Sequence, residues 1–223
     1  MKYTLPSPLS EGTNPQDRGL RVISAEAVSE KTVKAVLSDG THLKISAETA
    51  ELFGIKNGAV LSDDIEEILH DSELRRAKST ALNVLSYNNR SSAKLRERLL
   101  KSYPEDIVDE IMPDLVSAGL VNDNEYAYTY AYDAVRVKLW GDMRIVRELR
   151  LRGIDDDSIE EAIALASEDG FSEEERLEIL VENKYAARIY DEKSRKRAFD
   201  ALLRLGYRFG DIRNALNIIE ETD

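Results

Sequence analysis

The chain has 223 residues, a net charge of −12, no cysteine and only two histidines, His42 and His70. The absence of cysteine excludes disulfides and thiolate metal sites, and two histidines far apart in sequence do not predict a metal centre. No apolar run reaches the roughly 20 residues that cross a bilayer, and the N-terminal segment lacks the apolar core of a secretory signal, so we expect a cytoplasmic protein without membrane contact.

The N-terminal third of the sequence divides into a tail and a small β-rich unit. Residues 1–19 contain three of the five prolines and little apolar material, which predicts a mobile tail. Residues 20–62 contain runs of β-branched residues, and Asp39-Gly40 separates two of them. Because glycine accepts a positive φ, this pair favours a tight hairpin. A short helix capped by Ser46 is expected to follow.

From residue 63 onward the apolar residues recur at helical spacing. Ser91, Asn122 and Ser172 each stand at the expected start of a helix, where a side-chain oxygen can accept from a free backbone N–H. The segment EYAYTYAY (125–132) alternates as a strand would. The Asn122 cap and an alanine stripe at helical spacing nevertheless favour a helix there.

A three-helix pattern recurs three times. In each copy an amphipathic run is followed by a small residue, then an apolar residue and a second amphipathic helix; the small residues are Ser102, Gly153 and Gly206. Their separation of about 50 residues is the period of a tandem helical repeat. We therefore predict a mainly α fold in which tandem three-helix repeats form an elongated curved stack after the β-rich unit. The predicted segments are a linker helix with the first repeat at 63–123, the second repeat at 124–170 and the third at 171–223.

Charge is distributed in bands that follow these repeats. Bases predominate in 75–104, 135–152 and 184–213, whereas 105–134 contains acids and no base, and 153–183 contains a single base. Each repeat therefore contains one basic band, and the acidic helices lie between the basic ones in sequence.

The stretch WGDMRIVRELRLRGI (140–154) concentrates four arginines on one short helix. A helical wheel places Ile145, Val146 and Leu149 on one face and the arginines on the rest. The first repeat has the same division. The candidate partner-binding residues are Lys94, Arg98, Lys101, Arg144, Arg147 and Arg150. The competing interpretation is an ordinary solvated face that exchanges charge with neighbouring acidic helices.

The sequence contains no pattern typical of catalysis. A phosphate-binding G-x-x-x-x-G-K-[ST] loop, a G-x-S-x-G turn and an H-E-x-x-H zinc motif are all absent. Acidic runs at 155–157 and 173–175 stand where helices begin, a position that favours acids without any metal. We expect neither an enzyme nor a bound cofactor.

The middle of the chain resembles the RecX family of bacterial recombination regulators. A leucine-rich helix follows the pair Arg90-Ser91, as in that family. The motif L-x-x-x-G-x-x-[ND]-D-x-x-[FY]-A-x-x-[YF] is matched by Leu115, Gly119, Asn122, Asp123, Tyr126, Ala127 and Tyr130. The motif G-x-x-R-I-x-x-E-L-x-x-x-G-I is matched by Gly141, Arg144, Ile145, Glu148, Leu149, Gly153 and Ile154. Ser102 departs from the pattern, because the second and third repeats have glycine there.

This resemblance implies tandem three-helix repeats and a role in DNA repair and the SOS response. It implies binding of a monomer to the RecA recombinase filament, with single-stranded DNA inside the filament as a further partner, and inhibition of its ATPase and strand exchange. It implies no catalytic residue. The first alternative is a direct DNA-binding protein built from helix-turn-helix-like units, which the acidic helices disfavour. The second is an interaction scaffold for another partner.

Overall fold

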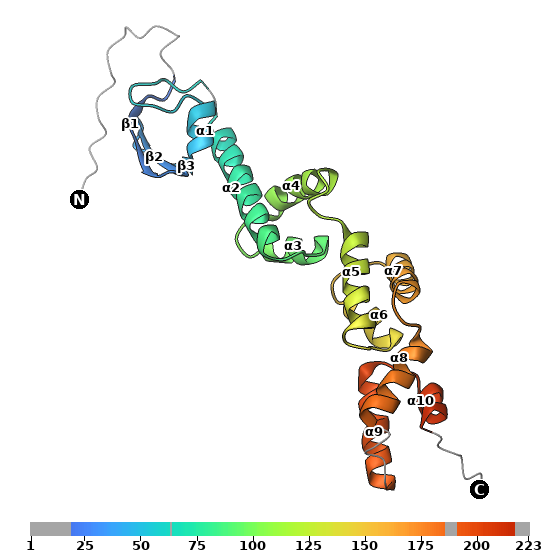
Figure 1. Ribbon diagram of the computed structural model, residues 1–223. Coiled ribbons are helices and arrows are strands. Elements are labelled where there is room, and N and C mark those ends of the chain that lie inside the picture. The colour runs from blue at the N-terminus through green and yellow to red at the C-terminus, as the bar shows by residue number, and fades with distance from the viewer. Residues whose placement is uncertain (1–18, 63, 186–190, 217–223) are drawn as a thin grey trace, which may run out of the picture. The chain divides into compact units, whose positions relative to one another are not determined.

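The computed structural model describes residues 19–62, 64–185 and 191–216, shown as ribbons in Figure 1. The predicted mobile tail, apart from its last residue, and the end of the predicted third repeat lie outside these ranges. The chain forms two compact parts that divide at Ser79, within one helix. The fold is mainly α with a small three-stranded sheet, as predicted. None of the described helices is long and apolar enough to span a bilayer.

The N-terminal part contains an antiparallel sheet in the order β1 (Val22–Ser29), β2 (Thr32–Leu37), β3 (His42–Ser46). The predicted hairpin joins β2 and β3. The backbone N–H and the hydroxyl of Thr41 both donate to the Asp39 carboxylate, and Gly40 has a φ of +89°. One face of the sheet contributes Leu37, Leu43 and Ile45 to a buried apolar cluster. The predicted β-rich unit is therefore a sheet with one packed face.

Two helices continue from this sheet, α1 (Ala47–Leu52) and α2 (Ile65–Tyr87). The Ser46 hydroxyl accepts from the backbone N–H of Thr49 at 2.9 Å, which confirms the predicted cap. The Thr49 hydroxyl donates in turn to Asp71 of α2 at 2.7 Å. These hydrogen bonds satisfy polar groups that the apolar core would otherwise leave unpaired.

The first repeat comprises the end of α2, α3 (Ser92–Leu99) and α4 (Glu105–Ser117). Leu95 and Leu99 of α3 are fully buried, as are Ile107 and Ile111 of α4. The apolar spacing of three and four residues thus brings one face of each helix into a shared core. The Ser91 side chain caps α3 as predicted.

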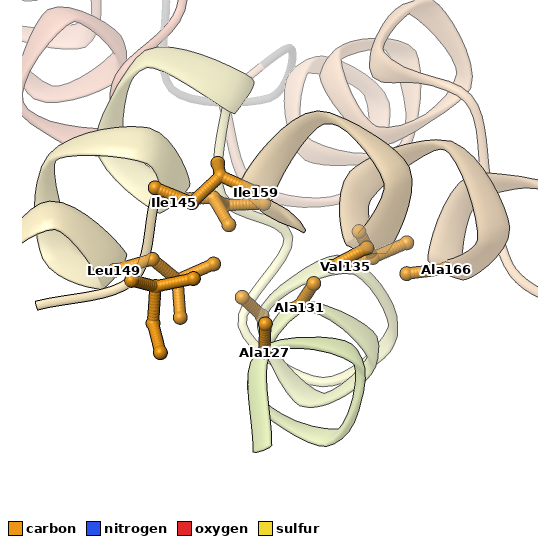
Figure 2. Packing of buried hydrophobic residues seen from close by; sticks show 10 residues of the cluster. Ala127, Ala131, Val135, Ile145, Leu149, Ile159 and Ala166 are labelled. Atoms are coloured by element: carbon orange, nitrogen blue, oxygen red, sulfur yellow. The ribbon is translucent and has the colours of Figure 1, made fainter. Parts of the chain in front are cut away.

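The second repeat comprises α5 (Asp123–Arg136), α6 (Asp142–Arg150) and α7 (Asp156–Glu168). EYAYTYAY is helical, and Asn122 accepts from the N–H of Glu125 at 3.1 Å. Figure 2 shows the alanines of α5 facing the buried residues of α6 and α7. Ile145 and Leu149 are fully buried and Val146 partly so, which confirms the apolar face predicted for α6. Small residues on α5 let α7 pack closely against it.

The third repeat comprises α8 (Glu173–Leu180), a π-helical turn η1 (Val181–Tyr185), α9 (Glu192–Leu205) and α10 (Phe209–Ala215). Leu177, Leu202, Tyr207 and Ile212 form its core. The Ser172 hydroxyl and the Glu175 side chain make a reciprocal capping box at the start of α8. All three helix caps predicted for the repeats are confirmed.

The middle helices of the second and third repeats end in the same glycine turn, and that of the first does not. In the second repeat the N–H of Ile154 donates to Leu149 and that of Gly153 to Arg150, with Gly153 at a φ of +79°. This is the Schellman pattern, which needs a left-handed residue. In the first repeat the N–H of Tyr103 donates to the carbonyl of Leu99, so this turn is one residue shorter than the turn from Leu149 to Ile154. Ser102 therefore avoids the left-handed conformation, because this turn is shorter.

Candidate functional site

The predicted binding residues lie on the middle helices α3 and α6, but the two helices do not present the same charges. Counted from their N-caps, Ser91 and Gly141, Leu95 corresponds to Ile145 and Leu99 to Leu149. In this register only Lys94 and Arg144 place a base at the same position, whereas Arg147 corresponds to Glu97. Both middle helices are therefore rich in bases, but apart from this one position the bases do not stand at equivalent places.

Arg144 is held against the third repeat. Its guanidinium lies 3.9 Å from the centroid of the Trp140 ring and donates to the carbonyl of Arg204 at 3.3 Å. Its Nε is buried without an acceptor among the described residues. Cation–π contact and burial give this arginine an internal role in addition to any contact with a partner.

Arg147 and Arg150 project further from α6. Arg150 is 58% exposed, yet it bonds both oxygens of the Asp156 carboxylate at 2.6 and 3.0 Å. This bidentate pair lowers the pKa of Asp156 and ties the end of α6 to the start of α7. Arg147 is 63% exposed and its nearest carboxylate, Glu148, is 3.7 Å away. Arg147 is thus the most exposed of the three predicted arginines of α6, and its carboxylate partner belongs to its own helix.

The bases of α3 show a similar division. Glu97 lies between Lys94, at 2.8 Å, and Lys101, at 3.8 Å. Arg98 is exposed, and in the described part of the chain no carboxylate lies within ion-pair distance of it. Exposed ion pairs are worth little in water, so Lys94 and Lys101 can exchange Glu97 for an external anion.

The acidic helices neutralise part of the basic helices within their own repeats. Arg96 of α3 pairs with Glu105 at 2.8 Å and with Asp109 at 2.7 Å, both on α4. The pair between Arg150 and Asp156 does the same in the second repeat. Charge exchange between neighbouring helices, the competing interpretation of the charge bands, accounts for these bases. It does not account for Arg98 and Arg147.

A joint between the second and third repeats, which the sequence did not predict, is built around Arg176. This side chain has no exposed surface. It donates to the carbonyl of Trp140 at 2.6 Å, to the Asp142 carboxylate at 2.7 Å and to the carbonyl of Ser172 at 3.1 Å. A buried charge is tolerated when its donors are satisfied in this way. The sequence signal was present, since Arg176 is the single base in the acidic segment 153–183.

Backbone groups complete this joint. The N–H of Gly141 donates to the carbonyl of Leu205 at 2.9 Å, and a Cβ on Gly141 would lie 2.5 Å from the carbonyl carbon of Gly206. The buried Tyr207 hydroxyl donates at 2.9 Å to the carbonyl of Leu139, a residue with a φ of +48°. Such a conformation is costly for a branched side chain and persists where the surroundings hold it.

The joint between the first and second repeats contains the same two kinds of hydrogen bond, one to a carboxylate and one to a backbone carbonyl. The first backbone N–H of the middle helix donates to a carboxylate that begins the next repeat: Ser92 to Asp123 at 2.7 Å, and Asp142 to Glu173 at 2.8 Å. The Ser91 hydroxyl also donates to the carbonyl of Arg152 at 2.6 Å. Asp123 and Glu173 directly follow the helix caps Asn122 and Ser172. Comparing residues about 50 positions apart in the sequence could therefore have identified these two carboxylates as equivalent.

Burial raises the pKa of Glu173, and the neighbouring Asp142 carboxylate adds to the rise, although the backbone N–H of Asp142 opposes it. The folded state therefore favours the neutral carboxyl, and ionisation costs stability as the pH rises through the raised pKa. We expect Glu173→Gln, which keeps an oxygen acceptor, to be more stable than the parent protein at pH 7. The advantage should vanish near pH 4, around the ordinary pKa of glutamate, roughly 4.3.

Thermal unfolding of the parent protein and of Glu173→Gln across this pH range measures the difference in stability between them. The other carboxylates titrate in both proteins, so their contribution cancels in this difference. Glu174→Gln is the control, because Glu174 is the exposed neighbour on the same helix. An identical pH dependence for the two variants would refute the role given to the joint carboxylate.

Comparisons with known proteins agree with this repeat architecture. The family model described as RecX, first three-helix domain, matches residues 77–114, and that of the RecX second three-helix domain matches residues 122–163. The regulatory protein RecX of Bacillus subtilis (strain 168) is 28% identical over 200 residues, which cover 89% of this chain and 76% of that protein. That of Clostridioides difficile (strain 630) is 29% identical over 148 residues, covering 66% and 70%.

Two solved structures are also similar. A crystal structure of regulatory protein RecX matches 89% of this chain and 98% of its own with a TM-score of 0.63 at 20% identity, which speaks for the fold alone. The crystal structure of RecX from Lactobacillus salivarius matches 66% of this chain and 98% of its own with a TM-score of 0.55 at 27% identity. Among the described residues no group of three or more potential metal ligands was found.

Proposed function

We propose that this chain, which belongs to the RecX family of regulatory proteins, binds the RecA recombinase filament on single-stranded DNA and restrains its ATPase and strand exchange. The observation that carries the proposal is the match of two successive three-helix repeats to the first and second domains of that family. We further propose that it acts as a cytoplasmic monomer and by binding rather than by catalysis.

The charges of the middle helices support a filament-binding surface on α3 and α6. Of the predicted residues, Arg98 and Arg147 are exposed and, within the described ranges, pair with no carboxylate of a neighbouring helix, while Lys94 and Lys101 share one exposed glutamate. Exposed cations of this kind attract acidic protein surface or phosphate and speed association. Arg144 and Arg150 remain part of the proposed surface, but their internal contacts make them poor sites for a clean test.

The alternative of a duplex-reading protein gains no support from the second repeat. Helix-turn-helix proteins place the N-terminal residues of a recognition helix in the major groove. Here the N-terminus of α6 is occupied by Glu173 and Leu205 of the third repeat. The N-terminus of α7 carries Asp155, Asp156 and Asp157, which would repel phosphates.

Replacing Arg98 and Arg147 together by glutamate is expected to raise about tenfold the protein concentration that half-inhibits the recombinase ATPase, since unlike charges across an interface become like charges. The measurement is ATP hydrolysis by RecA on single-stranded DNA, titrated with each protein. Far-UV circular dichroism should be unchanged, because both side chains are exposed.

The double variant Lys34→Glu, Lys44→Glu changes the total charge by the same amount on the N-terminal sheet, where the two lysines face each other across β2 and β3. It should inhibit as the parent protein does. Full inhibition by a folded Arg98→Glu, Arg147→Glu variant would remove these arginines from the binding surface.

A further inference from the structure

A positively charged hollow of about 610 Å³ lies where the first and second repeats meet. It is lined by three bases, two amides, one aromatic ring and one leucine: Arg90, Lys94, Arg152, Asn88, Asn89, Tyr126 and Leu151. Among the described residues, none of those that line the hollow is a carboxylate. In a chain of net charge −12 this is a local concentration of positive charge.

The walls of the hollow are held in place by the repeat joint. Ser91 bonds the carbonyl of Arg152 at 2.6 Å, and Ser92 bonds Asp123 at 2.7 Å, so the loop before α3 is fixed against the second repeat. Tyr126 lies on the first turn of α5, beside Asp123. A site whose sides come from two elements tied together in this way is formed before a ligand arrives.

The charges of the hollow are available to an anion. Arg90 lines the hollow, and no carboxylate within the described ranges pairs with it; its Nε is buried without an acceptor, so only the rest of the guanidinium can meet an anion. Lys94 has only an exposed pair with Glu97, at 2.8 Å. Arg152 is bound to Glu148 at 2.9 Å and lies over the Tyr130 ring, so it contributes a fixed cationic wall and not a free donor.

An aromatic row continues from the hollow along the second repeat. The Tyr126 and Tyr130 rings stack with centroids 6.3 Å apart, and Trp140 lies 6.3 Å beyond Tyr130. Lys138 lies over both Tyr130 and Trp140, at 5.2 and 4.9 Å from their centroids. Arg152 and Arg144 already lie on Tyr130 and Trp140, so Tyr126, which lines the hollow, is the ring of this row that can take a base beside the positive charge that a phosphate needs.

We infer that this hollow binds a nucleotide of single-stranded nucleic acid, with the phosphate between Arg90 and Lys94 and the base on Tyr126. A carboxylate of a protein partner would use the cations but not the Tyr126 ring that lines the hollow. A duplex would offer phosphates, but its bases are already stacked on one another. Only an unpaired nucleotide uses both features of the hollow. This binding is independent of the recombinase and goes beyond the proposed function.

The test is fluorescence anisotropy of a labelled oligothymidylate of about 15 nucleotides, near the upper site size of small single-strand-binding folds. It is titrated with the full chain, without recombinase, at several salt concentrations. Tyr126→Leu should weaken binding about tenfold, because one base loses its stacking partner. Arg90→Gln should also lower the slope of log affinity against log salt by about 0.7, the contribution of one phosphate on a single strand.

Two controls remove the same kinds of side chain, a tyrosine and an exposed base, elsewhere. Tyr128→Leu removes a tyrosine of the same helix whose hydroxyl bonds Asp169, away from the hollow. Lys196→Gln removes an exposed base of α9. Both variants should bind the oligonucleotide as the parent protein does.

Several outcomes would overturn the inference: no binding of the oligonucleotide by the parent protein, unchanged binding by folded Tyr126→Leu and Arg90→Gln, or an equal loss in the controls. The same proteins are assayed for inhibition of the recombinase ATPase. Loss of inhibition by Arg90→Gln with unchanged oligonucleotide binding would assign the hollow to a carboxylate of the recombinase and would also overturn it. Failure of oligonucleotide binding with inhibition intact would leave the proposed function standing.

Discussion

Arg176→Met is expected to lower the free energy of unfolding of the helical part by about 3–5 kcal/mol, the usual cost of removing one partner from a buried ion pair. Methionine fills much of the same volume but donates no hydrogen bond. The Asp142 carboxylate would lose its charged partner and the carbonyl of Trp140 would lose its donor, whereas the carbonyl of Ser172 would keep the backbone N–H of residue 176. The loss should be concentrated at the joint between the second and third repeats.

Urea unfolding followed by fluorescence measures this directly, because Trp140 is the single tryptophan of the chain and lies in that joint. Arg147→Met is the matched control, since the Arg147 side chain is 63% exposed and should change the unfolding free energy by less than about 0.5 kcal/mol. A loss of similar size in both variants would mean that the buried arginine does not hold the repeats together.

Gly153→Ala is expected to cost about 3 kcal/mol through two effects. Gly153 has a φ of +79°, where an alanine costs roughly 1–2 kcal/mol. In addition, its new Cβ would lie 2.3 Å from the Cβ of Ala93 on α3, and relieving such a clash by backbone movement costs roughly 1–3 kcal/mol. The substitution should therefore strain the joint between the first and second repeats as well as the turn.

The chain offers a control for each effect. Gly119→Ala has the same kind of backbone conformation, with a φ of +69°, but nothing lies within 4 Å of the new Cβ, so it isolates the backbone cost. Ala93→Gly removes the other half of the clash, and the double variant should recover about the difference between Gly153→Ala and Gly119→Ala. Urea unfolding of the four variants completes the cycle. If Ala93→Gly brings no recovery, the close approach of the repeats does not limit residue 153.

The same glycine turn explains why the first repeat departs from the other two. Gly153 and Gly206 each pack closely against the middle helix of the preceding repeat. Ala93 of α3 lies against Gly153, and Arg144 of α6 lies against Gly206. The first repeat follows no other three-helix repeat, so its shorter turn at Ser102 has no such helix to accommodate. The departure noted in the sequence is thus a consequence of position in the array.

The sequence determined the local structure of this protein well. Caps at Ser91, Asn122 and Ser172 depend on hydrogen bonds that span three residues, and the buried faces of the helices depend on a period of 3.6 residues. Both are properties of neighbouring residues, so they can be predicted without knowing what lies across from them. The tandem three-helix repeats and the RecX resemblance were predictable for the same reason, because they are patterns of spacing.

Only the tertiary structure decided which charged side chains are free. Arg144, Arg147 and Arg150 share one helix and one residue type, yet Arg144 lies on Trp140, Arg150 is bound to Asp156 of the next helix, and Arg147 has only a 3.7 Å pair with Glu148 of its own helix. Arg176 stands in an acidic segment and is nevertheless buried. A long side chain takes its partner from whatever backbone or carboxylate the next element brings within about 3 Å, the length of a hydrogen bond. That distance is set by the packing of helices far apart in sequence, which the spacing of residues along one helix does not contain.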